Sequence, residues 1–207
     1  MTRTVAWIVR AAGWWSTPLF ALYNGVLGVW YSSLWHGSIC AYYLLLSLLR
    51  SVLLTAEARR RSGRLSKDRE RAVARAVSAL LFVLNAALIA PATLMVLDQR
   101  GVRMGMIPAI TTATYTTYKI TAACVRLKRA KASPCARQLA RLRFVDALVS
   151  ILVLQNTLIT AVEGAVTDKM LLLSAITTAA ILLVILALSI LWLVWDAQKR
   201  RREKFTP

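Results

Sequence analysis

Histidine, cysteine and acidic residues are all scarce in this chain of 207 residues, which contains 1 His, 3 Cys and 9 Asp and Glu together. A single histidine, His36, cannot build a multi-histidine metal cluster or a histidine-based triad within one chain. The phosphate-binding patterns GxGxxG and GxxxxGK followed by Ser or Thr are also missing. We therefore expect no catalytic residues, no cofactor and no enzyme activity.

The three cysteines add little chemistry. Cys40, Cys124 and Cys135 are an odd number without CxxC spacing. They fall in apolar segments or in a basic loop between such segments, so we expect no structural disulfide.

Apolar residues, in contrast, are abundant: they make up 58% of the chain, whose mean hydropathy is +0.57. Runs of about 20 apolar residues are long enough to cross a bilayer as helices. Five runs are clear: 34–56, 76–97, 104–125, 144–166 and 170–195. A sixth run, 5–31, carries Arg10, Pro18 and Asn24 and could either span the membrane or lie in its interface. This run has no small-residue cleavage site, so we expect it to be retained rather than removed as a signal peptide.

The sequence thus predicts an all-α, polytopic membrane helix bundle in one domain, residues 1–207, with a basic tail over 197–207. Six transmembrane helices are favoured. The alternative is five with an interfacial N-terminal helix.

Basic residues are concentrated between the apolar runs. The 27 Lys and Arg give a net charge of +18, and most lie in Arg59–Arg75, Arg126–Arg143 and Lys199–Lys204. This is the positive-inside pattern of cytoplasmic loops rather than a nucleic-acid groove with stacking aromatics. It predicts a multi-pass protein of the cell membrane with both termini cytoplasmic and no nucleic-acid partner. Contacts with anionic lipid head groups are expected at Arg59, Arg60, Arg61, Arg200 and Arg201.

Polar residues within the apolar runs define the candidate intramembrane site: Asp146, Lys119, Arg50, Tyr42 and Asn24. Ionisable side chains in a bilayer are costly and mark functional positions. Lys119 and Asp146 are expected at similar depths near the inner leaflet, so the sequence predicts that they pair. The competing arrangement pairs Asp146 with Arg143 or Arg50. Hydrogen bonds between helices are expected at Asn24, Asn85, Gln155 and Asn156.

Small residues dominate "ITTATYTTYKITAAC" (110–124). They favour a helix buried in the bundle, where it either lines a pathway or simply packs closely.

The stretch "SPCARQLARLRFVDALVS" (133–150) resembles the entry to the fifth transmembrane helix of cation diffusion facilitators, whose pattern is roughly SPxLxxDxxHxxxDxxxS. Ser133-Pro134, Asp146 and Ser150 match. Residues 20–50 match more loosely, as a helix with an Asn leading through a Gly and Ser-Leu into a second helix. The "SxW…AYYLLLxLxR" helix at Ser33–Arg50 also looks like that of a group of small bacterial membrane proteins.

This resemblance implies a six-helix cation-efflux-like bundle and, by analogy, a homodimer, for which the small residues of Thr111–Thr117 offer a surface. It also exposes departures. Leu142 stands at the histidine position, and Tyr42 and Leu46 stand near the ligand positions of the second helix. One carboxylate cannot hold a four-coordinate ion, so we expect no metal site. The predicted function is a transporter-like protein of unknown substrate without an intact zinc site; the alternative is a non-transporting membrane partner or structural subunit.

Overall fold

The computed structural model describes residues 3–98, 106–129, 133–161 and 168–205. This part of the chain is all-α. It forms α1 (Arg3–Trp30), α2 (Leu34–Arg61), α3 (Lys67–Ala87), α4 (Ile89–Asp98), α5 (Met106–Arg129), α6 (Pro134–Ala161) and α7 (Asp168–Phe205).

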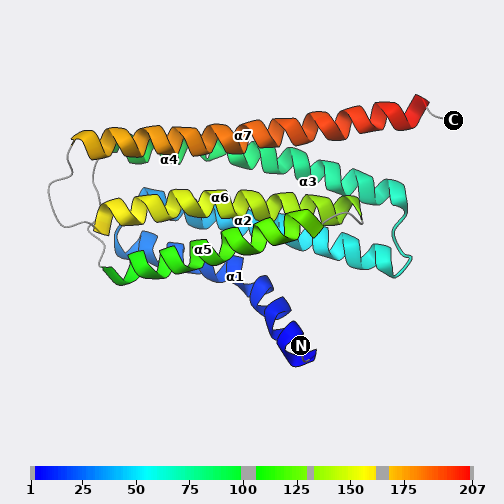
Figure 1. The fold of residues 1–207 in the computed structure, drawn as a ribbon, viewed down its shortest axis with the longest axis horizontal. Coiled ribbons are helices and arrows are strands. Elements are labelled where there is room, and N and C mark those ends of the chain that lie inside the picture. Colours follow the sequence, from blue (N-terminus) through cyan, green and yellow to red (C-terminus); the bar gives the residue numbers. More distant parts are fainter. Residues whose placement is uncertain (1–2, 99–105, 130–132, 162–167, 206–207) are drawn as a thin grey trace.

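The helices run roughly parallel or antiparallel to one axis, with α2 and α6 in the middle of the bundle (Figure 1). The helix α1 packs on α2, α5 packs on α6, and α3 with α4 packs on α7. The turn between α2 and α3, the start of α6 and the end of α7 all lie at the same end of the bundle (Figure 1). The three basic regions of the sequence are therefore gathered at that end.

Proline and glycine explain where two helices stop. Pro91 has no N–H to donate to the carbonyl of Ala87, four residues earlier, so the helical run breaks between Ala87 and Ile89. At the end of α2, Gly63 has φ +72° and its N–H donates to the carbonyl of Arg60, while Arg64 N donates to the carbonyl of Arg59. This left-handed cap favours glycine.

The start of α6 gives the Ser-Pro pair a local role. Ser133 Oγ accepts a hydrogen bond from the N–H of Ala136 at 3.0 Å, and Pro134 occupies the first helical position. Serine as the N-cap and proline in the first turn are favourable choices for any helix. The Ser-Pro match to the facilitator pattern is therefore also explained by capping.

The helices are longer than the apolar runs that predicted them. We expected a basic loop before 144, but α6 already begins at Pro134; α3 begins at Lys67 rather than near 76, and α2 continues to Arg61. These boundaries were wrong because hydropathy measures the apolar length needed to cross a bilayer. A helix can continue beyond it with charged residues exposed.

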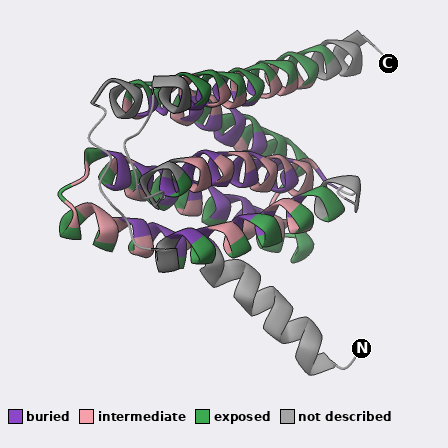
Figure 2. Ribbon diagram, turned by 60° about the vertical axis from the view of Figure 1, so that its left-hand side comes forward, coloured by how far each residue is buried: buried purple, intermediate pink, exposed green. Residues whose placement is uncertain are grey.

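Burial follows the bundle. Buried residues line the inward faces of the helices and exposed residues the outward faces (Figure 2). Many of the outward side chains are large and apolar, such as Leu44 and Leu48 on α2 and Leu183 and Trp195 on α7. Among the residues that the structure describes, three helical segments are long and apolar enough to cross a membrane: Leu34–Arg61, Lys67–Thr93 and Leu172–Gln198. Exposed apolar faces on such helices are compatible with a membrane location.

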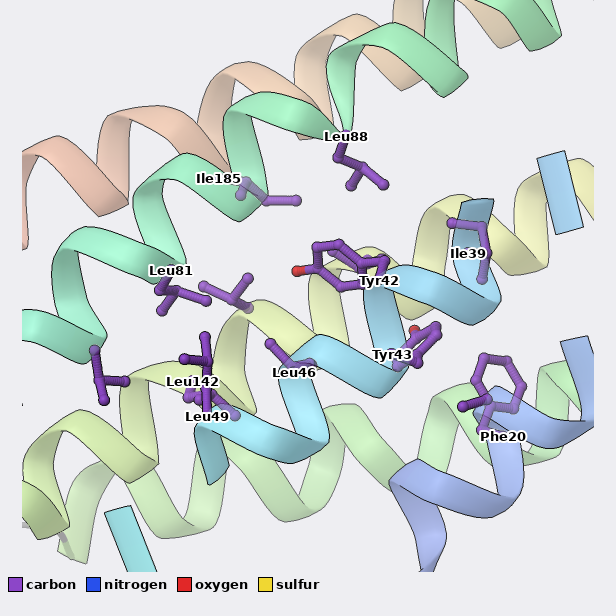
Figure 3. Close-up of a cluster of buried hydrophobic side chains, with 14 of the residues drawn as sticks. Phe20, Ile39, Tyr42, Tyr43, Leu46, Leu49, Leu81, Leu88, Leu142 and Ile185 are labelled. Carbon is purple, nitrogen blue, oxygen red and sulfur yellow. The ribbon is translucent and has the colours of Figure 1, made fainter. Parts of the chain in front are cut away.

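The core lies around α2 (Figure 3). Tyr42, Tyr43 and Leu46 are fully or almost fully buried there, against Leu142 of α6 and Leu81 of α3. The α2 helix thus has neighbours on several sides, which is why its sequence shows no single apolar stripe.

Candidate functional site

The predicted pair of Lys119 and Asp146 is present, and it joins α5 to α6. Lys119 Nζ donates to Asp146 Oδ1 at 2.6 Å, and the two side chains are 6% and 8% exposed. Charges this deeply buried are tolerated only when they are paired and hydrogen-bonded. The geometry confirms the pairing that the sequence favoured.

Ser150 extends the pair toward α2. Its hydroxyl lies one turn beyond Asp146 and donates to the Asp146 backbone carbonyl at 2.8 Å. A hydroxyl has one hydrogen, so Ser150 Oγ accepts its other two contacts: Lys119 Nζ at 3.0 Å and Tyr43 Oη at 2.9 Å. Tyr43 is therefore the donor to Ser150. Thr116 adds a further link, donating to the Ser150 carbonyl at 3.2 Å.

Aromatic rings enclose the ammonium group of Lys119. The nitrogen lies 4.4 Å from the ring centre of Tyr43 and 4.8 Å from those of Phe20 and Tyr115. Phe20 packs edge-on against Tyr43 and stacks on Tyr115, so the three rings form one wall. Ring faces attract cations, and more strongly where water is excluded. We call Lys119, Asp146, Ser150 and the three rings the cation cage.

Arg50 borders the cation cage from α2. It is buried, and its Nη1 donates to Thr17 Oγ1 of α1 at 3.0 Å. The competing prediction paired Arg50 with Asp146. The structure places Lys119 in direct contact with Asp146, and Arg50 is a second buried positive charge close by.

Tyr42 belongs to a different network. Its hydroxyl donates to Asn85 Oδ1 of α3 at 3.0 Å, and Asn85 Nδ2 donates to Ser189 Oγ of α7 at 2.9 Å. Figure 3 shows its oxygen directed toward α3 and away from Tyr43. Tyr42, a member of the candidate intramembrane polar site, thus bonds to Asn85 rather than directly to Lys119 or Asp146, and the predicted bridging role of Asn85 is confirmed.

Asn24 and Gln155 also bond away from the cation cage. Asn24 Nδ2 donates to the Phe20 carbonyl of its own helix at 2.8 Å. The bond that the structure gives Asn24 therefore lies within α1 and does not bridge two helices as predicted. Gln155 Nε2 reaches α7, where it donates to Thr177 Oγ1 and to the Ser174 carbonyl. This is the helix-bridging role expected for it. The side chain of Asn156 lies outside the described residues.

The metal-ligand positions implied by the facilitator resemblance are filled by core side chains. Leu46 and Leu142 are buried in the hydrophobic cluster (Figure 3). In the part of the chain that the structure describes, no group of three or more His, Cys, Asp or Glu could hold a metal ion. Asp146 meets an ammonium group where the resemblance would place a metal ion.

His36 lies two turns before Tyr43 on the same face of α2. It is buried, and neither ring nitrogen has a hydrogen-bond partner among the described residues. His36 lies in the first turn of α2, at the end of the bundle opposite the basic regions (Figure 1).

Glu70 of α3 contacts both α2 and α6 at the basic end of the bundle. Its carboxylate contacts Arg60 Nε at 3.1 Å and accepts a 3.4 Å hydrogen bond from the backbone N–H of Cys135. Burial, followed by the nearby Glu70 charge, raises the pKa of the Cys135 thiol from 9.0 to about 11. Cys135 is therefore held as a neutral thiol.

The arginines expected at lipid head groups differ in their surroundings. Arg61 pairs with Glu57 at 2.6 Å, while Arg60 pairs with Glu70. Arg59 is exposed and lines a surface pocket with Arg64, Ser62 and Ala58. The side chains of Arg200 and Arg201 lie outside the described residues.

Sequence reasoning missed most of the cage. Tyr43, Phe20 and Tyr115 were not predicted, and Ser150 was noticed only as part of a motif. One pattern could have found Tyr43: His36, Tyr43 and Arg50 recur every seven residues and so share a face of α2. Tyr42 is rotated about 100° from that face.

Comparisons of the chain with protein-family models, with curated proteins and with solved structures find no match. The function must therefore be argued from the cage itself.

Proposed function

We propose that this chain is a six-span membrane protein with both termini on the cytoplasmic side. The position of the basic regions at one end of the bundle supports this orientation. The sixth span is supported by α1: a Cβ placed on Gly28 would lie 3.0 Å from the backbone nitrogen of Gly37 on α2. Such close helix contact is typical of packed membrane helices and is not needed for a helix lying on the surface.

Cysteine labelling tests this topology. In a cysteine-free background, Arg61→Cys and Thr2→Cys should label only from the cytoplasmic side, and Leu34→Cys only from outside. The matched sites Arg61 and Leu34 are both exposed, at opposite ends of α2. External labelling at Thr2 would instead favour five spans with an interfacial N-terminal helix.

Within this bundle we assign a transporter-like function, with the cation cage as the substrate or coupling-ion site. The observation that carries the proposal is the buried Lys119–Asp146 pair, placed where side chains of α1, α2, α5 and α6 meet. Intramembrane ionisable residues that face the bundle interior mark ion and proton pathways. The facilitator resemblance supports the same proposal. It implies a cation-efflux-like bundle, in which the Lys119 ammonium would stand beside Asp146 in place of the metal ion.

The alternative is a non-transporting membrane partner or structural subunit, in which the pair ties α5 to α6. The tight enclosure of Lys119 by three rings favours this reading. A homodimer through the exposed threonines of α5, such as Thr114 and Thr117, remains a prediction under either proposal.

Flux across proteoliposomes distinguishes the two. Purified protein would be reconstituted and tested for movement of cations, protons and labelled lipid, beside Asp146→Asn as the matched control. If the protein is a transporter, the unmodified protein should show flux and the Asp146→Asn variant should show none. Equal leakage from protein-containing and protein-free vesicles for every solute would support the structural role.

A further inference from the structure

Asp146 has surroundings suited to a cation of single charge. The Ser150 hydroxyl lies 3.0 Å from the ammonium nitrogen that contacts Asp146, Tyr43 Oη lies 2.9 Å from that hydroxyl, and the aromatic wall faces the ammonium nitrogen. Oxygen donors and ring faces stabilise small cations of low charge. Lys119 fills this position in the structure, so any external cation must compete with it.

Charge balance limits which cation can compete. Arg50 is a second buried positive charge near the cage, and Asp146 supplies one negative charge. If a monovalent cation replaces the proton on Lys119, the charge of the site stays constant. A divalent ion would leave one extra positive charge in a region where unpaired charge is costly.

We infer that the cation cage is a monovalent-cation site for which the ammonium of Lys119 is the built-in competitor. This inference rests on the proposed transport function and names its substrate class. When an alkali cation binds Asp146, one N–H bond of the ammonium breaks and its electron pair stays on nitrogen. The neutral amine gives up its position beside Asp146 to the cation, and the proton leaves to water. One monovalent cation is exchanged for one proton, with no net charge moved.

Lysine suits this exchange, whereas arginine does not. A buried lysine can release its proton, but a guanidinium stays charged. The other charged or titratable groups facing Lys119 are Asp146 from α6, Tyr43 and Arg50 from α2 and Tyr115 from α5. From α1, Phe20 contributes an uncharged ring.

Proton release from detergent-purified protein in weak buffer tests the inference. Sodium or potassium chloride should release about one proton per chain, since cation binding and deprotonation are linked. The large organic salt N-methylglucamine chloride should release none at equal ionic strength. Asp146→Asn should release none with any salt. Lys119→Met should bind labelled sodium or rubidium without releasing protons.

The outcomes are distinguishable from those of the flux assay. Proton release without flux would keep the cation site and reject transport. Flux without proton release by any monovalent salt would keep transport and overturn the monovalent-exchange inference. Release by magnesium chloride alone would also overturn it. Should both variants fail to fold, the salt comparison on the unmodified protein still decides.

Discussion

Ser150 Oγ lies 3.0 Å from Lys119 Nζ and 2.9 Å from Tyr43 Oη, so one hydroxyl links α2, α5 and α6. Because Ser150 also donates to the carbonyl of Asp146, its hydrogen-bonding capacity is used in full. The Lys119 ammonium is thus held through contacts that involve three helices at once. A change in any of them can alter how firmly the ammonium is held.

The coupling between Lys119 and Asp146 should appear in a double-mutant cycle. Lys119→Met and Asp146→Asn should each destabilise the purified protein by about 3 kcal/mol, because each leaves a buried group without its partner. The double variant should cost far less than the two together. Thermal unfolding in detergent provides the measurement, and simple additivity would reject an energetic coupling.

Substitutions of the two adjacent tyrosines, Tyr42 and Tyr43, should have different effects on stability and on ion exchange. Tyr42→Phe removes a donor to Asn85 and should cost about 1–3 kcal/mol of stability without affecting ion exchange. Tyr43→Phe keeps the aromatic ring but removes the donor to Ser150. This variant should change the salt dependence of proton release as well as the unfolding temperature, whereas Tyr42→Phe should change the unfolding temperature alone. An equal effect of the two variants on release would contradict this division.

Much of the framework follows from the sequence, but the composition of the cage does not. Hydropathy locates the helices, and the depths of Lys119 and Asp146 predict their pairing. The choice between Tyr42 and Tyr43 depends on the rotation of α2 about its axis. That rotation is set by neighbours on several sides, and in a helix that is apolar almost all round its trace in the sequence is the seven-residue spacing of His36, Tyr43 and Arg50.

The aromatic wall was harder still to foresee. Phe20 and Tyr115 come from α1 and α5, which are distant in sequence and meet only through their side chains. The charged ends of the helices were missed for another reason. Basic residues such as those of 134–143 are as compatible with an exposed helix as with a loop.

Close packing of α1 against α2 predicts a difference between two glycines. Gly28→Ala should destabilise the protein by about 1–3 kcal/mol, because its new methyl group meets the backbone of Gly37 at 3.0 Å. Gly37→Ala is the matched control, since nothing lies within 4 Å of a Cβ there. Equal unfolding temperatures for the two variants would argue against the α1–α2 contact.

Cys135 should react far more slowly with maleimide than Cys124. Cys135 is buried and the pKa of its thiol is raised to about 11, whereas Cys124 is exposed. Cys135 is therefore a poor reporter of topology. Mass spectrometry of briefly labelled protein should find the label on Cys124, with Cys135 modified only after unfolding.

The same thiol gives a pH dependence. Since the folded protein holds the proton more tightly, the stabilising contribution is fully present below the ordinary pKa of 9.0 and is lost as pH rises toward about 11. A Cys135→Ser variant should lose less stability than the unmodified protein over this range. Parallel unfolding curves across that range would contradict the expected contribution.

Lys119→Arg provides the most direct test of whether the cation cage exchanges ions or only ties helices together. Arginine keeps a positive charge beside Asp146 but does not release its proton. In proteoliposomes, a sodium or potassium gradient should drive proton counter-movement with the unmodified protein. With Lys119→Arg this movement should fall at least about tenfold, the factor that corresponds to a 1.4 kcal/mol change in barrier, while the thermal unfolding temperature stays close to the original. Undiminished exchange by a stably folded Lys119→Arg protein would contradict the account.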